Sequence, residues 1–164
     1  MDRELDKASL YRLVGEINRD TLNPAFLRLL ESPTFYFKQV LHQMQKQIRE
    51  TLVDFDLTET QFTLLMGLIV LTKDGRRATQ MDLANFMKLD KMMVSEVLRT
   101  LEKKGYVNRV SNPEDKRAKS LIVTEKGIKI NEMALERTVE IDEQFFSALG
   151  DDREELVRIL KKLI

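Results

Sequence analysis

Apolar positions recur with a helical period along most of the chain. Ser32-Pro33 begins one such stretch, whose apolar residues are spaced three or four apart: Phe37, Leu41, Met44, Ile48 and Leu52. The segment "LTETQF" begins another, with Thr58 placed as the N-cap and Gln61 three residues later, the spacing of a capping box. The apolar run "FTLLMGLIVL" behind it predicts a buried helix that ends near residues 73–75.

Two shorter helical segments follow in close succession. In "ATQMDLANFM", Thr79 is the expected N-cap and Asp82 the N3 residue. A break follows at residues 88–89, and then "DKMMVSEVLRTLEKKG" begins with Asp90 as N-cap and ends where Gly105 is suited to terminate a helix. Two short helices joined by about four residues predict a helix-turn-helix.

A small hairpin and further helices complete the pattern. "YVNRV" (106–110) and "SLIVT" (120–124) read as two short strands that flank a charged loop with an Asn-Pro turn signal. A helical pattern runs from Thr124 to Gly150, and Asp151 or Asp152 is expected to cap a last helix. Residues 1–32 also look helical, although Asn23-Pro24 interrupts them. The predicted class is mainly α with a small β-wing.

Composition narrows the class of protein further. The chain has 164 residues, enough for one domain with a full core, and 33% of them are charged. It contains no cysteine, which excludes disulfides and thiol chemistry. The longest apolar run is about half as long as a membrane span requires, and the charged N-terminus lacks the apolar core of a signal peptide. We expect a cytoplasmic protein that does not enter the membrane.

Charge is distributed unevenly although the formal net charge is zero. Residues 99–119 hold seven basic and three acidic side chains, whereas residues 131–164 hold five basic and nine acidic ones. A basic middle beside an acidic tail is compatible with a polyanionic partner, but such asymmetry also arises by chance.

The segment from residue 90 to residue 104 has two distinct faces at about 100° per residue. One face is apolar and comprises Met93, Val94, Val97, Leu98 and Leu101. The other is mostly polar and comprises Met92, Ser95, Glu96, Arg99 and Lys103. Any amphipathic surface helix has this pattern. Its position, after a short capped helix and before a two-stranded wing, favours insertion into a DNA major groove.

The stretch "TQMDLANFMKLDKMMVSEVLRTLEKKGYVNRVSNPEDKRAKSLIVTEKG" (79–127) resembles the winged helix-turn-helix core of MarR-type transcriptional regulators. The family's most specific local feature is Asp-x-Arg in the wing, followed by a strand ending in Leu-x-x-Thr. Here these are Asp115-Lys116-Arg117 and the stretch from Leu121 to Thr124, and "LEKKGYV" also matches. The resemblance extends over roughly residues 33–164.

The resemblance implies a winged helix-turn-helix core flanked by N- and C-terminal dimerisation helices. It divides the chain into an N-terminal helical segment that contributes to dimerisation (1–57), the DNA-binding region (58–123) and C-terminal dimerisation helices (124–164), intertwined as one domain. It further implies a homodimer that binds a pseudo-palindromic operator in double-stranded DNA as a ligand-responsive repressor. The implied effector is a small organic acid, often aromatic, bound between the dimer helices and the DNA-binding lobe.

The residues expected to contact DNA lie on the second short helix, at the starts of both short helices and in the wing. They are Thr79, Gln80, Lys91, Met92, Ser95, Glu96, Arg99, Lys103, Asp115, Lys116, Arg117 and Lys119. By resemblance, Arg117 enters the minor groove and Asp115 orients it through a charge-assisted hydrogen bond. The alternative is an exposed local ion pair of little energetic value.

Three positions depart from the family pattern. Small hydroxyl residues are common where this chain has Met92 and Met93, and a basic residue is frequent in place of Glu96. Met92 either packs on a thymine methyl group or is a partly exposed filler. Glu96 either accepts a hydrogen bond from a cytosine amino group or pairs with Arg99 or Lys103. Base specificity is therefore not transferable from the family.

Other candidate sites are weaker. His42, the single histidine, shares a helical face with charged residues and is expected to be solvated. Phe35, Tyr36 and Phe37 either line a small-molecule crevice or, as we favour, belong to a core. We find no nucleotide loop, metal-ligand spacing or nucleophile–base pair, so we expect neither an enzyme nor a cofactor. The main alternative function is a winged-helix module for protein–protein assembly without an operator of its own.

Overall fold

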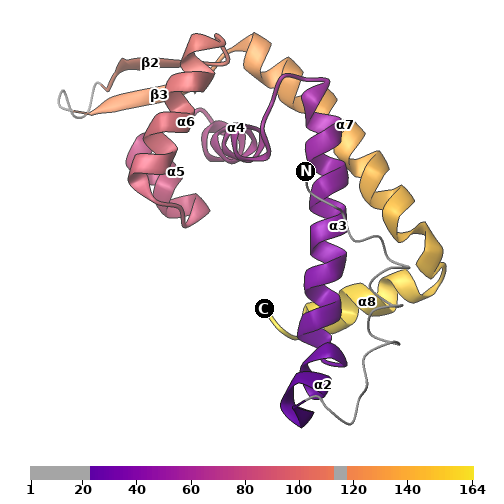
Figure 1. Ribbon diagram of the computed structural model, residues 1–164. Coiled ribbons are helices and arrows are strands. Elements are labelled where there is room, and N and C mark those ends of the chain that lie inside the picture. Colours follow the sequence, from indigo (N-terminus) through magenta and orange to yellow (C-terminus); the bar gives the residue numbers. More distant parts are fainter. Residues whose placement is uncertain (1–22, 113–117) are drawn as a thin grey trace, which may run out of the picture. The chain divides into compact units, whose positions relative to one another are not determined.

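The structure is a computed structural model that describes residues 23–112 and 118–164, and it is mostly helical with a small antiparallel sheet (Figure 1). This confirms the predicted fold class. The chain separates into two compact units, residues 1–43 and residues 44–164. The helices are α2 (Pro24–Leu30), α3 (Pro33–Val53), α4 (Glu59–Thr72), α5 (Gln80–Met87), α6 (Lys91–Lys103), α7 (Glu125–Phe146) and α8 (Asp152–Leu160), with a 3-10 turn, η2 (Ser147–Leu149). The strands are β1 (Ala78–Thr79), β2 (Val107–Ser111) and β3 (Lys119–Val123).

The first unit contains α2 and the beginning of α3. The Asn23-Pro24 pair, which was expected to interrupt the N-terminal helical pattern, is where α2 begins. The Asn23 side chain accepts a hydrogen bond from the Ala25 N–H at 2.9 Å, and proline is favoured at the first helical position. Tyr36 and Phe37 are half-exposed, so the expectation that they belong to a core is wrong for this chain alone. His42 is exposed, as predicted.

The helices of the winged region begin at the residues that the capping patterns predicted. Thr58 and Gln61 form a reciprocal capping box on α4, and Thr79 and Asp82 form another on α5. The Asp90 carboxylate accepts hydrogen bonds from the N–H groups of Met92 and Met93, the second and third residues of α6, at 2.8 and 3.1 Å. Each such cap stabilises its helix by about 1 kcal/mol, and together they set the ends of the helix-turn-helix.

The sheet has the order β1-β3-β2, and all its pairs are antiparallel. The predicted hairpin is confirmed with a shift of one residue in each strand, since β2 spans 107–111 and β3 spans 119–123. β1 was not predicted, because two residues are too short to produce an alternating pattern. Its Ala78 is opposite Leu121, and both side chains are buried.

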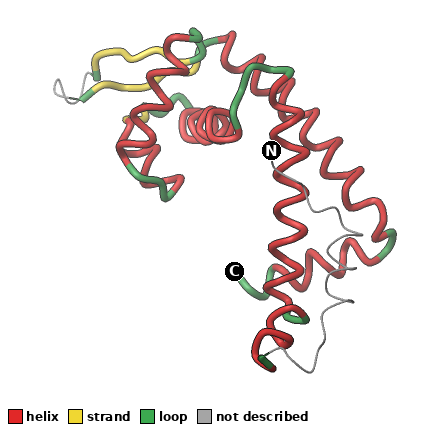
Figure 2. Tube along the Cα trace, viewed as in Figure 1, coloured by secondary structure: helices red, strands yellow, loops and turns green. Residues whose placement is uncertain are grey.

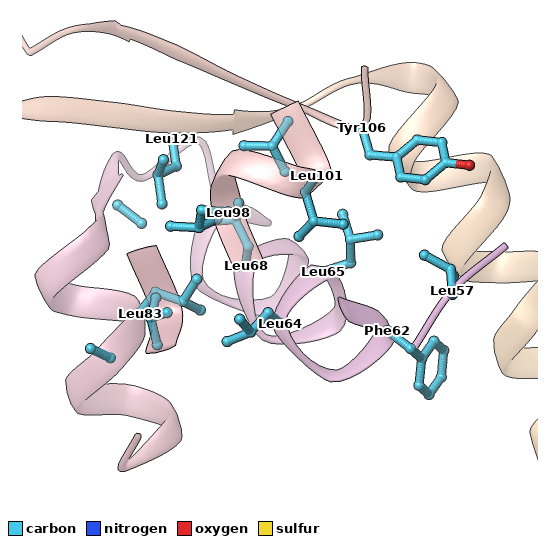
Figure 3. Close-up of a cluster of buried hydrophobic side chains, with 14 of the residues drawn as sticks. Leu57, Phe62, Leu64, Leu65, Leu68, Leu83, Leu98, Leu101, Tyr106 and Leu121 are labelled. Atoms are coloured by element: carbon cyan, nitrogen blue, oxygen red, sulfur yellow. The ribbon is translucent and has the colours of Figure 1, made fainter. Parts of the chain in front are cut away.

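A hydrophobic cluster holds the second unit together, and α4 contributes Phe62, Leu64, Leu65 and Leu68 to it (Figure 3). In Figure 2, α4 is the helix that is viewed along its axis. The helix α4 is apolar nearly all round because α5, α6, α7 and β3 all contact it. The buried hydrophobic side chains are Leu52, Leu57, Phe62, Leu64, Leu65, Leu68, Ala78, Leu83, Ala84, Val94, Leu98, Leu101, Tyr106, Val107, Leu121 and Ala134. The α6 residues among them, Val94, Leu98 and Leu101, belong to the face that was predicted to point inward.

The C-terminal helices continue from the wing. Thr124 caps α7 by accepting a hydrogen bond from Gly127 N–H at 3.0 Å, directly before the helical pattern that was predicted to follow it. Asp151 precedes α8, but its backbone is helical and its side chain makes no capping hydrogen bond, so the capping prediction is wrong for Asp151; Asp152 is already the first residue of the helix. None of the residues of α8 is buried. Among the described residues, no helix is both long and apolar enough to cross a membrane.

Two regions of the predictions lie outside the described residues. These are residues 1–22 of the N-terminal segment and the tip of the wing (113–117), which contains Asp115, Lys116 and Arg117. Their expected roles remain predictions from the sequence.

Candidate nucleic-acid interface

The turn between α5 and α6 is rigidly built. Lys88 adopts a left-handed conformation with φ of 52°, which ends α5, and Leu89 N–H donates to the Ala84 carbonyl at 3.0 Å. The Gln80 side chain donates from Nε2 to the carbonyl of Lys91 at 3.1 Å. This bond joins the first residue of α5 to the first residue of α6. The predicted helix-turn-helix is therefore present, and its two N-termini are held side by side.

The polar face of α6 is presented to solvent. Met92 is 74% exposed, and Glu96, Arg99 and Lys103 are exposed as well, whereas Ser95 is half-buried. Met93 lies partly buried on the inner side, as its helical position predicted. We call the five outward residues the reading face of α6: Met92, Ser95, Glu96, Arg99 and Lys103.

In the described part of the chain, the Glu96 carboxylate forms no ion pair with a cation of α6, including Arg99 and Lys103. The structure thus removes the alternative in which an ion pair within α6 occupies Glu96. Its carboxylate is left available as a hydrogen-bond acceptor, the chemistry that a cytosine amino group or an adenine amino group requires.

Sequence reasoning missed an ion pair that ties α6 to the wing. Glu102 near the end of α6 and Arg109 in β2 approach to 3.0 Å between Oε2 and Nε, with both side chains about 30% exposed. The Nε hydrogen is not directed at the carboxylate, so the contact is an ion pair without a proper hydrogen bond. No pattern in the sequence points to this pair, because only the turn at Gly105 brings the two residues together. Because of this ion pair, Arg109 is less available to contact an anionic partner than its place in the basic segment suggested.

A cavity of about 610 Å³ lies where the start of α5, the start of α6 and the wing strands meet. Its lining contains four of the predicted site residues, Thr79, Gln80, Lys91 and Lys119. The lining residues Lys91, Lys119 and Arg109 are cationic. Its one carboxylate, Asp82, accepts hydrogen bonds from the N–H and the hydroxyl of Thr79, both at 2.8 Å. Three cations around two helix N-termini suit an anionic group such as a phosphate.

The remaining electrostatic features lie elsewhere. A hydrogen bond from Arg158 lowers the pKa of the Glu155 carboxyl in α8, well away in sequence from the reading face. Among the described residues, no group of three or more histidines or acidic residues is placed to hold a metal ion.

Comparison with known proteins adds family information. Residues 57–119 match the model of the MarR family. The HTH-type transcriptional regulator YdcH of Bacillus subtilis, itself uncharacterised, is 43% identical over 117 residues, which cover 71% of this chain and 80% of YdcH. The HTH-type transcriptional regulator SarZ of Staphylococcus haemolyticus is 31% identical over 109 residues, covering 66% of this chain and 71% of SarZ.

Solved structures agree with these sequence relatives. The DNA complex of MepR from Staphylococcus aureus has a TM-score of 0.69 and 28% identity, with 80% of this chain and 96% of MepR covered. Wild-type MarR from Escherichia coli, without ligand, has a TM-score of 0.69 at 24% identity and shares the fold over 81% of this chain and 97% of MarR. The family match at 57–119 includes α4, α5, α6 and β2, which carry most of the interface described above.

Proposed function

This chain belongs to the MarR family of DNA-binding transcriptional regulators, and we propose that it works as a homodimeric, ligand-responsive repressor of a pseudo-palindromic operator. The observation that carries the proposal is the reading face of α6, a row of hydrogen-bonding and apolar groups on a helix whose opposite face buries Val94, Leu98 and Leu101. An α-helix of this kind fits the major groove of B-DNA. The resemblance noted in the sequence and the DNA complex of MepR support the same placement.

Each residue of the reading face has a defined chemical task in this proposal. Arg99 donates two parallel hydrogen bonds to a guanine, and Ser95 donates or accepts at a neighbouring base. Glu96 accepts from an exocyclic amino group, and the thioether of Met92 packs on a thymine methyl group. Lys103, one helical turn further on, contacts the phosphate backbone.

The cationic cavity and the wing supply contacts without base readout. Thr79, Gln80, Lys91 and Lys119 surround the cavity described above and bind one backbone phosphate between the helix N-termini. By resemblance, Asp115, Lys116 and Arg117 extend the wing into the adjacent minor groove, with Arg117 as the inserted side chain. Such contacts contribute affinity to every sequence alike.

We assign dimerisation to the terminal segments, residues 1–57 and 124–164, around a DNA-binding region at 58–123. Large apolar side chains are exposed along α7 and at the C-terminal end: Leu135, Val139, Val157, Ile159 and Leu163. Leu163 is 78% exposed, and burial of such side chains in a second copy would remove their apolar surface from water. A symmetric dimer of this kind would place the two reading faces on one side of a DNA duplex.

In this proposal, the protein has no catalytic activity and acts in the cytoplasm, where its operator is. Its effector is a small organic acid that binds between the dimer helices and the DNA-binding lobe and lowers operator affinity. A screen of small phenolic acids by thermal shift, followed by measurement of DNA release, identifies the compound class. A ligand that stabilises the protein without releasing DNA would contradict the effector's role.

Salt-dependent binding to DNA tests this function against the assembly-module alternative. A fluorescently labelled pseudo-palindrome, recovered from random DNA by the chain itself, is titrated at several salt concentrations. A repressor binds it far more tightly than an unrelated duplex, and the affinity falls steeply with salt because released counterions drive binding. An assembly module gives equal, weak binding to both duplexes.

A further inference from the structure

Lys104 occupies the place where two chain segments leave the winged helix-turn-helix. Its backbone ends α6 as the C-cap, and Gly105 follows with φ of +73°, which turns the chain into β2. Unlike its neighbour Lys103, which is exposed, Lys104 has a side chain that is only 22% exposed. Because so little of its side chain is exposed, contact with DNA does not account for the position of Lys104.

The ammonium group of Lys104 is bound inside the protein. It donates hydrogen bonds to the Asp56 carbonyl and, at 3.2 Å, to Oε1 of Gln61, and it forms an ion pair with the Asp56 carboxylate at 3.0 Å. Two of its three donor hydrogens are therefore bonded within the chain, and its charge is balanced by Asp56. Asp56 lies in the turn between α3 and α4 and itself has a left-handed backbone, with φ of 51°. Gln61 is buried and belongs to the capping box of α4.

The backbone of the same residue is bound from the other side. Lys126 in the first turn of α7 donates from Nζ to the Lys104 carbonyl at 2.9 Å and lies 4.9 Å from the centre of the Tyr106 ring. Thr124 adds two hydrogen bonds, from Oγ1 to the Gly105 carbonyl at 2.7 Å and from its N–H to the Tyr106 carbonyl at 3.0 Å. Figure 3 shows Tyr106 and Leu57 at the end of the buried cluster that is nearest α7.

We infer that Lys104 is a positioning residue that holds the end of α6 to the turn at Asp56 and to the start of α7, and thereby sets which half-site spacing the protein accepts. The inference rests on the proposed homodimeric function, because spacing has meaning only for two linked reading faces. The side chain of Lys104 holds the turn that leads to α3, and its carbonyl holds the start of α7. Both exits from the DNA-binding region are thus bound to one residue at the end of α6.

The rigidity of this joint determines how strongly affinity depends on the half-site spacing. A dimer whose reading faces are held rigidly binds one spacing well, since no order has to be imposed on binding. When the joint at Lys104 is loosened, each reading face still matches its half-site, but its position relative to the dimer helices varies. Affinity for the preferred spacing then falls, while other spacings are penalised less.

The test uses the full-length chain and the pseudo-palindrome that wild type selects from random DNA. Variants of that DNA have the central spacer lengthened or shortened by one or two base pairs. Wild type is expected to lose roughly tenfold or more in affinity when the spacer changes, because each added base pair rotates and displaces one half-site. Lys104→Met keeps the apolar stem and removes the three donors. It should bind the preferred spacing roughly 3- to 30-fold more weakly and discriminate among spacings several-fold less.

Matched variants separate positioning from other roles. Lys104→Arg keeps a donor cation and should restore most of the spacing preference, and Lys73→Met, at an exposed lysine directly after α4, should behave as wild type. Asp56→Asn removes the carboxylate but keeps the turn and its carbonyl, so it should weaken discrimination only partly. Since Asp56 is 82% exposed, this variant also serves if Lys104→Met proves unstable in circular dichroism. The half-site sequence preferred by every variant should be unchanged.

Two results would overturn the inference. In the first, Lys104→Met keeps the wild-type spacing profile. In the second, it loses affinity equally at all spacings and its dependence of log affinity on log salt falls by about one unit, which identifies Lys104 as a phosphate contact. A wild-type protein without any spacing preference is a distinct outcome, because it contradicts the homodimeric function as well as the inference.

Discussion

Substituting Gly127 by alanine is a sharp test of how α7 joins the DNA-binding region. A β-carbon at this position would lie 2.2 Å from the carbonyl oxygen of Tyr106 and 3.0 Å from a methyl carbon of Val123. The oxygen belongs to the backbone of a buried residue and cannot rotate away. The start of α7 must therefore move, although alanine is intrinsically the better helix former.

The magnitude follows from the groups that the shift disturbs. Alanine in place of glycine within a helix contributes about 1 kcal/mol of stabilisation. Overpacking against a backbone atom costs about 1–3 kcal/mol. Displacing Thr124 from the carbonyls of Gly105 and Tyr106 weakens two hydrogen bonds, at about 1 kcal/mol each. The expected net loss in the free energy of unfolding is about 2–4 kcal/mol.

Urea unfolding followed by circular dichroism measures this loss, at a fixed protein concentration because dimerisation adds to stability. Gly67→Ala is the matched control in α4, since its new β-carbon would lie 2.6 Å from the sulfur of Met87, the far end of a flexible side chain. We expect Gly67→Ala to cost clearly less than Gly127→Ala. If Gly127→Ala were as stable as wild type or more stable, helix propensity would outweigh the contact and the reasoning about this joint would be wrong.

Three further predictions concern binding and assembly. Ser95→Ala and Arg99→Ala should change which bases are preferred, at about 1–3 kcal/mol per lost contact, and selection from random DNA would expose the error if preferences stayed the same. Arg117→Ala should weaken binding to all sequences and lower the salt slope by roughly one unit, whereas a change in preferred major-groove bases would refute its assignment to the wing. Deleting residues 151–164 should abolish dimerisation while preserving the helical fold, because α8 buries no residue within its own chain; sedimentation of the truncated protein as a dimer would refute this.

Local signals in the sequence were sufficient for the helices of the winged region. Thr58, Thr79 and Asp90 cap the helices that their spacing predicted, because N-capping is decided by side chains within three residues. The two faces of α6 were also predictable, since a helical period of 3.6 residues converts sequence order directly into burial.

Features that depend on distant contacts were not predictable in the same way. β1 exists because Ala78 pairs with Leu121, more than forty positions further along the chain, and no local sequence pattern predicts it. The Glu102–Arg109 pair and the contacts of Lys104 likewise depend on turns at Gly105 and Asp56. Asp151 shows the reverse error, because a good capping residue does not cap when its backbone is already helical.

The DNA contacts themselves are predicted only in part by geometry. The structure confirms that the reading face of α6 is exposed and brings Thr79, Gln80, Lys91 and Lys119 to one cavity. The roles of Asp115, Lys116 and Arg117 derive from the resemblance alone. Base preference depends on donor and acceptor positions against a duplex, which neither the helical period nor family membership specifies.

Selection of DNA from a random pool by the full-length protein tests the central claim most directly. The pool is sequenced after several rounds, and the enriched sites are aligned without imposing symmetry. We predict a pseudo-palindrome whose half-sites are about one helical turn apart, roughly 34–36 Å centre to centre, and whose enrichment is lost when Arg99 and Ser95 are both replaced by alanine. Enrichment of no sequence at all, or of a single unsymmetrical site that the double variant selects equally well, would contradict the account.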